Sequence, residues 1–179
     1  GTGVLSMLAA KAGARKVIGV ERSEMAKIAR ELVNRNGLKD TVEIFHGDAK
    51  DLKLDEPVDV IISEWLGHMA YVECMFPSVI QVRDAWLKPG GILLPSGVDV
   101  LIAPIDDGEL YNEFGPGFWG KTNIHGLDFS YLTEKELEMG HANQLLVPDK
   151  FLLAKGKRIH HLETNIAAPG DEWCSGTVD

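Results

Sequence analysis

Short apolar runs that alternate with helical patterns constrain the fold of this chain most. The runs that fit one buried strand each are Val17–Val20, Val42–Phe45, Val58–Ile62 and Ile92–Leu94. Apolar residues recur with helical spacing in the segments that begin near Val4, Met25 and Phe76. Buried strands joined through helices pair in parallel, with right-handed connections. The sequence therefore predicts an α/β fold with a doubly wound, mostly parallel sheet.

The character of the sequence changes after Pro95–Gly97, where an antiparallel portion is predicted to begin. Residues 106–140 are polar, irregular and rich in glycine and aromatic residues, and such long insertions usually serve function or bind a partner. We expect later strands at Leu152–Ala154 and Ile159–Leu162. We assign residues 1–97 to a first domain and residues 98–179 to a second, partial β domain.

Charge and cysteine usage narrow the function classes. The formal net charge of −9 argues against nucleic acid as a direct partner and favours attraction of basic segments. The two cysteines, Cys74 and Cys174, form no Cys-x-x-Cys motif, so we expect free thiols in a reducing compartment. His160 and His161 have no acid or cysteine at ligand spacing, which favours an ordinary surface pair over a metal site.

The first fifty residues contain the pattern of a nucleotide-cofactor site. Gly1-Thr2-Gly3 opens a helix that ends at Gly13, and glycines there let a ligand approach the backbone. Glu21 follows the Val17–Val20 strand, where an acid commonly binds both ribose hydroxyls. Asp48 follows the next strand and could accept a hydrogen bond from adenine. Each feature alone has an ordinary explanation: a plain loop, a helix-dipole acid and a turn-stabilising aspartate.

The stretch Ser63–Met75 carries the chemistry. It follows the Val58–Ile62 strand and holds two carboxylates, Glu64 and Glu73, separated by mostly apolar residues. Carboxylates held against an apolar wall repel each other unless a cation lies between them. A guanidinium is the natural guest, because its planar fork forms bidentate hydrogen bonds to carboxylates. For either glutamate considered alone, an ordinary structural role is the better explanation. Glu64 would then cap a helix, and Glu73 would be a solvated helix residue.

This stretch resembles the double-glutamate loop of the protein arginine methyltransferases, usually Ser-Glu-Trp-Met-Gly, five residues, then Glu-x-Met. The residues that match in spacing and type are Ser63, Glu64, Trp65, Gly67, Glu73 and Met75. The resemblance covers nearly the whole chain, including Gly1–Gly3, Ala9–Ala14, Val17–Glu21, Trp86–Gly91 and Gly126–Ser130. The second half is most similar to nuclear type I members, through Ala103–Ile105 and Gly117–Trp119.

The resemblance implies a class I methyltransferase fold with S-adenosylmethionine as cofactor and Glu64 and Glu73 as the catalytic residues. The residues implied at the cofactor are Gly1, Thr2 and Gly3 in the glycine turn, Glu21 on the ribose, Asp48, Ala49 and Ser78 around adenine, and Met75 near the transferring methyl. No metal is implied. The family further implies an antiparallel β-barrel that starts in the second half, with a helical dimerisation arm at about residues 107–140.

By the same resemblance, the implied substrates are arginine-rich proteins such as histones, methylated to mono- and asymmetric dimethylarginine by a homodimer in nucleus and cytoplasm. The chain departs from the family at Leu66 for methionine, His68 for tyrosine and Lys50 for an acid. The match begins inside the glycine motif, so we expect an internal fragment without the strand between those that end at Glu21 and Ser63. Exposed strand edges predict that the polypeptide alone folds poorly and does not bind cofactor measurably.

Other functions stay open. A methyltransferase for a different acceptor, such as a small amine, would keep the glycine turn and Glu21 but has no need of two spaced glutamates. A non-catalytic scaffold with the same fold gains modest support from His68 and Lys50. A dinucleotide dehydrogenase is disfavoured, because Ser6 stands where the third glycine of its motif belongs.

Overall fold

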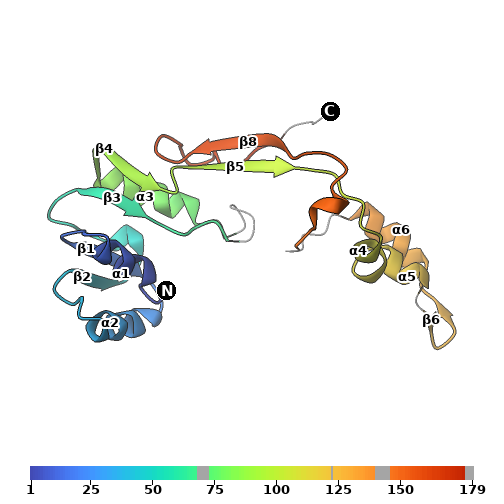
Figure 1. Cartoon of the computed structure of the whole chain (residues 1–179), viewed down its shortest axis with the longest axis horizontal. Coiled ribbons are helices and arrows are strands. Elements are labelled where there is room, and N and C mark those ends of the chain that lie inside the picture. The colour runs from blue at the N-terminus through green and yellow to red at the C-terminus, as the bar shows by residue number, and fades with distance from the viewer. Residues whose placement is uncertain (68–72, 122, 140–145, 176–179) are drawn as a thin grey trace. The chain divides into compact units, whose positions relative to one another are not determined.

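The computed structural model describes residues 1–67, 73–121, 123–139 and 146–175 (Figure 1). The chain divides into two compact units, which are treated separately below. One contains residues 1–98 and 161–174, and the other contains residues 99–160 together with Ser175. The predicted assignment of a cofactor-binding domain and a partial β-barrel domain to residues 1–97 and 98–179 stays a prediction.

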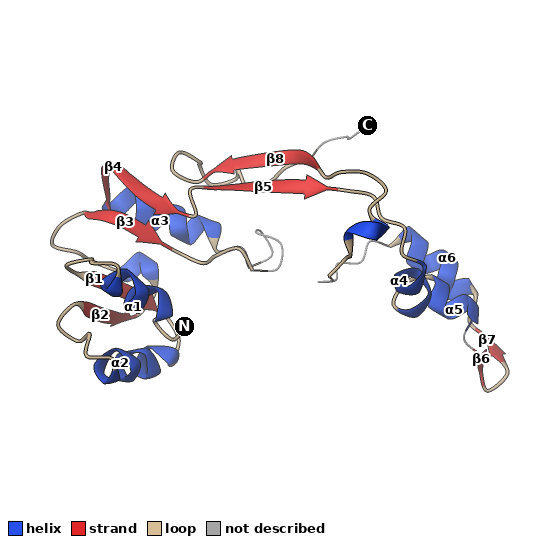
Figure 2. Cartoon of the chain, in the orientation of Figure 1, coloured by secondary structure: helices blue, strands red, loops and turns tan. Residues whose placement is uncertain are grey.

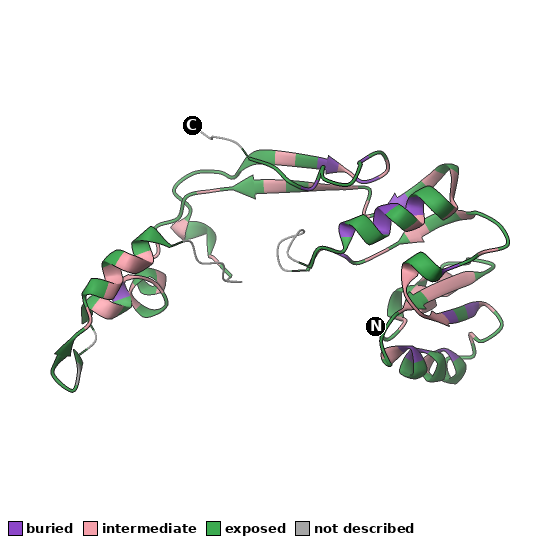
Figure 3. Cartoon of the chain, turned by 180° about the vertical axis from the view of Figure 1, so that it is seen from behind, coloured by how far each residue is buried: buried purple, intermediate pink, exposed green. Residues whose placement is uncertain are grey.

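The first layer of the larger unit is a pair of parallel strands covered by a helix. Helix α1 (Val4–Lys11) ends two residues before the predicted Gly13, which has a φ of +103° and turns the chain away from the helix. Strands β1 (Val17–Glu21) and β2 (Val42–His46) then pair in parallel, and Glu21 lies opposite His46. Helix α2 (Met25–Arg35) packs on β2, burying one apolar stripe. The core between α2 and β2 consists of Ala26, Ala29, Val33, Val42 and Ile44. Figure 3 shows buried positions in purple.

A second parallel pair carries the candidate catalytic stretch. Strand β3 (Val58–Ile62) pairs with β4 (Leu87–Leu94), and helix α3 (Phe76–Trp86) connects them, with Pro77 tolerated in its first turn. The turn predicted at residues 88–91 lies inside β4. Val58 pairs with Leu87 but Val60 pairs with Ile92, so these four residues bulge out of the ladder before it resumes.

The described strands form two separate two-stranded parallel sheets (Figure 2). The predicted parallel pairing is confirmed, and the described strands form no single continuous sheet, as expected without a strand between those that end at Glu21 and Ser63. Within the described residues β1 bonds only to β2 and β3 only to β4. Each of these four strands thus keeps one edge without a strand partner in that part of the chain, and apolar side chains such as Val60 and Ile62 stay 44% exposed.

A late segment of the chain completes the core beside α3. The buried cluster comprises Trp65, Phe76, Val79, Ile80, Leu93, Leu162 and Ala167. The guanidinium of Arg83, on α3, is buried and donates hydrogen bonds of 2.8 Å to the carbonyls of Thr164 and Ala167. Asn165 Oδ1 accepts a bond from the Leu93 amide. Buried polar groups that find partners in this way hold residues 164–167 on α3 and β4.

The remaining elements follow β4. Strand β5 (Gly97–Ile102) pairs with β8 (Lys157–Glu163), which runs in the opposite direction (Figure 2). Between them lie α4 (Gly108–Glu113), α5 (Gly117–Lys121), α6 (Tyr131–Glu138) and a small hairpin of β6 (Asn123–Ile124) and β7 (Leu127–Asp128). No helix in the described ranges has the length and apolarity needed to cross a bilayer.

The strand predicted at Leu152–Ala154 is wrong. Residues Asp149–Phe151 form a 3-10 turn, and Leu152 makes only an isolated antiparallel bridge with Ile105. The Leu153 amide donates a hydrogen bond to the Pro104 carbonyl beside this bridge. The strand predicted at Ile159–Leu162 is confirmed as part of β8.

Candidate active site

The segment after β3 begins with an exposed acid beside a buried anchor. Trp65 is 0% exposed and stacks on Phe76 with ring centroids 4.6 Å apart. Glu64 is exposed, and its Oε1 accepts a hydrogen bond of 3.2 Å from the Leu66 amide. Packing of Trp65 into the core therefore fixes the backbone next to Glu64, while the carboxylate itself stays accessible.

The far end of the same loop returns to its start. A β-carbon on Gly67 would lie 2.7 Å from Cγ and 2.8 Å from Cδ of Glu73, so the glycine backbone lies directly against that side chain. Gly67 has a φ of +51°, which glycine adopts freely. Residues 68–72, and with them His68, lie outside the described residues. The sequence-predicted pair Glu64 and Glu73 thus lies on one loop whose two ends touch.

Helix α3 starts at Phe76, three residues after Glu73. Cys74 has a φ of +51°, and Met75 precedes the helix, its carbonyl accepting the amide of Ser78 at 3.0 Å. Met75 is 41% exposed. Because Phe76 meets Trp65, the stacked rings join the beginning of the loop to its end. Both candidate catalytic residues therefore flank a rigid aromatic contact.

Glu21 and the glycine turn come together at the carboxyl end of β1. Oε2 of Glu21 contacts the Gly1 amino group, and its Oε1 accepts a bond of 2.6 Å from the Ser23 amide. The side chain is 19% exposed. Gly3 has a φ of +77° and lies close to Ala29. The acid is therefore held in place, and each carboxylate oxygen keeps a lone pair for a further donor.

Asp48 stabilises a turn, which is one of the two roles that its position in the sequence allows. Its Oδ1 accepts the Lys50 amide at 3.1 Å, and its Oδ2 lies 3.9 Å from Lys50 Nζ. These contacts start the 3-10 turn Ala49–Asp51. A role of Asp48 at adenine stays a prediction.

Sequence reasoning passed over His46, which stands in register with Glu21 on the neighbouring strand. Its Nε2 is 3.9 Å from Glu24 Oε1, and its side chain is 28% exposed. The signal was its position as the last residue of a strand beside Asp48, because strand ends in parallel sheets meet at one rim.

Comparison with known proteins decides the family. Residues 1–91 match the methyltransferase-domain family. A probable protein arginine N-methyltransferase 6.1 of Oryza sativa subsp. indica is 48% identical over 132 residues, which are 74% of this chain and 34% of the relative. Protein arginine N-methyltransferase 6 of Xenopus laevis is 41% identical over 131 residues, covering 73% of this chain and 38% of the relative.

The chain belongs to the protein arginine N-methyltransferase family. A solved Trypanosoma brucei PRMT1 enzyme–prozyme heterotetrameric complex with AdoHcy superposes with a TM-score of 0.85 at 35% identity, over 96% of this chain and 53% of that one. Arabidopsis thaliana protein arginine methyltransferase 10 gives a TM-score of 0.77 at 34% identity, over 94% and 53%.

As a member of this family, the chain has the class I methyltransferase fold. It spans about a third of the length of the curated arginine methyltransferases it matches, with 34% and 38% of two of them covered.

Proposed function

We propose that this chain transfers methyl groups from S-adenosylmethionine to guanidino nitrogens of protein arginines, in histones among other arginine-rich proteins, giving mono- and asymmetric dimethylarginine. The observation that carries the proposal is the contact of Gly67 with the Glu73 side chain, which closes the loop that also bears Glu64. An acidic loop closed in this way suits a planar cation better than a single capping acid would.

The residues at the end of β1 suit the cofactor. Glu21 has one oxygen oriented by the Ser23 amide and keeps lone pairs for two ribose hydroxyls, while the glycine turn leaves the backbone open beside it. We assign Gly1, Thr2, Gly3 and Glu21 to binding, with Asp48, Ala49 and Ser78 at adenine and Met75 near the methyl. When bound, S-adenosylmethionine supplies an electrophilic methyl on a sulfonium.

Glu64 and Glu73 would orient the substrate. Arginine is a poor nucleophile, because its charge is delocalised and its pKa lies far above neutral pH, so that it stays protonated. Two carboxylates that bind the guanidinium would fix its plane and draw positive charge toward the nitrogens that do not react. One glutamate then accepts the proton that methylation makes more acidic. Positioning and electrostatics supply most of the acceleration in this account.

The helices α4 to α6 are proposed to contact a second copy. They present several exposed apolar side chains, with Phe114 at 72%, Tyr131 at 63% and Leu137 at 63% exposure. Contiguous exposed apolar residues of this kind mark interaction surfaces. We propose that residues 107 to about 140 form the arm of a head-to-tail homodimer, that β5 and β8 begin a β-barrel, and that the enzyme works in nucleus and cytoplasm.

Matched peptides that differ only in Arg or Lys at one position test the proposal. The intact enzyme should methylate the Arg peptide alone, and Glu73→Gln should lower the rate on the order of 10²-fold or more. Glu56→Gln, an exposed acid outside the site, is the control and should keep the wild-type rate. Equal methylation of the Lys peptide, or an undiminished rate in Glu73→Gln, would refute the assignment. No turnover of either peptide would favour the scaffold alternative.

A further inference from the structure

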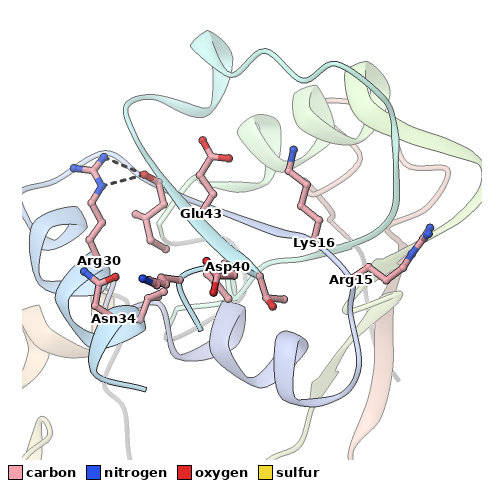
Figure 4. Close-up of a pocket in the computed structure, with 11 residues that line it drawn as sticks. Arg15, Lys16, Arg30, Asn34, Asp40 and Glu43 are labelled. Atoms are coloured by element: carbon pink, nitrogen blue, oxygen red, sulfur yellow. Dashed lines mark hydrogen bonds between the residues drawn. The ribbon is translucent and has the colours of Figure 1, made fainter. Parts of the chain in front are cut away.

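A pocket of about 630 Å³ lies at the amino ends of β1 and β2 (Figure 4). Its walls come from the turn before β1, from α2, and from the residues that lead into and form β2. Glu21 and Asp48 stand at the opposite, carboxyl ends of the same strands, so this pocket is separate from the candidate cofactor site. Its volume lies within the range of small-molecule sites, about 300–1,000 Å³.

The lining is cationic in an acidic chain. Arg15, Lys16, Arg30 and Lys39 line the pocket together with two carboxylates, Asp40 and Glu43, so the lining holds two more cationic than anionic side chains in a chain with a net charge of −9. Within the described residues, Lys16, Lys39, Asp40 and Glu43 form no ion pair with one another or with other groups. Their charges are therefore available to a ligand.

Arg30 is already oriented. Its Nε and Nη2 donate hydrogen bonds of 3.2 and 3.0 Å to the Ile44 carbonyl, which Figure 4 shows as dashed lines. The apolar floor beneath it, Val33, Val42 and Ile44, belongs to the buried core. A guanidinium fixed over a rigid floor loses little conformational entropy when an anion binds to its remaining N–H groups.

The mixture of charges specifies the ligand class. A basic arginine-rich segment would be repelled by the cationic surplus of the lining, and a long polyanion would be repelled by the net charge of −9 on the chain around it. A small molecule with one phosphate meets the cations, and its hydroxyl or amino groups can donate to the carboxylates. We propose that this pocket binds a small phosphate ester that carries hydrogen-bond donors.

Calorimetric titration of the intact enzyme with ribose 5-phosphate, inorganic phosphate and ribose tests the proposal. Ribose 5-phosphate should bind, inorganic phosphate should bind several-fold more weakly, and ribose should not bind. Amide NMR shifts should localise the change to residues 39–44. Absence of binding by ribose 5-phosphate at about 10 mM, or shifts elsewhere, would overturn the site, and equal affinity for inorganic phosphate would overturn the ester.

A double variant with its control probes the cations, and a single variant probes a carboxylate that would accept hydrogen bonds from the ester. Lys16→Gln combined with Lys39→Gln should weaken ribose 5-phosphate about 3- to 30-fold, whereas Lys11→Gln, a lysine of α1 outside the lining, should not. Glu43→Gln should weaken the ester more than it weakens inorganic phosphate. Since Lys16, Lys39 and Glu43 are exposed, folding should be retained, which far-ultraviolet circular dichroism checks. Equal losses in the Lys11→Gln control would contradict the proposal.

Discussion

The backbone of Gly67 lies against the side chain of Glu73, leaving no room for a methyl group between them. Gly67→Ala must therefore displace Glu73, in addition to the strain of a non-glycine residue at a φ of +51°. We expect the methylation rate of the intact enzyme to fall at least about 10-fold, because small misplacements of positioning groups are costly.

Gly37→Ala is the matched control for that strain. Gly37 has a φ of +68°, but an added β-carbon there would meet nothing within 4 Å. It should lose stability of about 1 kcal/mol, as measured by urea denaturation, and keep its activity. Equal activity losses in the two variants would mean that backbone strain, and not the position of Glu73, explains the effect.

Glu21→Gln should weaken cofactor binding. The neutral amide offers one oxygen acceptor where the carboxylate offers two, and it removes a charge-assisted hydrogen bond. We expect the dissociation constant of S-adenosylmethionine to rise about 10-fold or more in the intact enzyme, with kcat at saturation little changed. Calorimetry and initial rates measure these quantities. Glu31→Gln, on the exposed face of α2, should leave both values unaltered, and unaltered binding in Glu21→Gln would exclude the ribose role.

The pair Asp59–Lys88 makes stability depend on pH. The 2.7 Å hydrogen bond from Lys88 and its charge lower the pKa of Asp59 below the ordinary value of 3.8. The folded-state pKa is the lower one, so the stabilisation is present above the unfolded-state pKa and is lost as pH falls through the folded value. Asp59→Asn should lower the urea midpoint at pH 7 and match wild type at low pH. Asp55→Asn, an exposed acid on the preceding loop, should match wild type throughout, and a pH-independent deficit in Asp59→Asn would point to another cause.

Phe114→Ser tests the proposed arm. If α4 to α6 contact a second copy, removing this aromatic ring should weaken dimerisation of the intact enzyme at least about 10-fold. Mass photometry over a dilution series measures the monomer fraction. Trp173 is the control, because it is also an aromatic residue with 72% exposure but lies outside the arm. A monomer fraction that rises equally in Trp173→Ser would speak against a specific role of Phe114.

Local patterns predicted the elements that local forces determine. The apolar run before Glu21 gave β1, and the helical recurrence after Met75 gave α3 with Pro77 in its first turn. The Pro-Gly-Gly signal correctly marked an interruption, but it could not reveal that β4 extends on both sides of the bulge. Register between strands depends on partners that are distant in sequence.

The candidate site was predicted in its residues and not in its contacts. Spacing identified Glu64 and Glu73, yet nothing local indicates that Gly67 packs on Glu73. Likewise, Asp48 fits both an adenine contact and a turn, and only the structure reveals its bond to the Lys50 amide. The hydrogen bond from Arg83 to the Thr164 carbonyl joins residues that are 81 positions apart, and no local periodicity of the sequence predicts such a contact.

This long-range hydrogen bond affects the order in which the structure can form during synthesis. Ribosomes release a chain from its amino end, so α3 and Trp65 leave the exit tunnel well before the carbonyls of Thr164 and Ala167 exist to receive Arg83. The core around Trp65 and α3, which supports the loop with Glu64 and Glu73, is therefore completed only after the intervening helices have been synthesised. The buried hydrogen bonds of Arg83 form only after its acceptors have been synthesised, and the packing that supports Glu64 and Glu73 is complete only then.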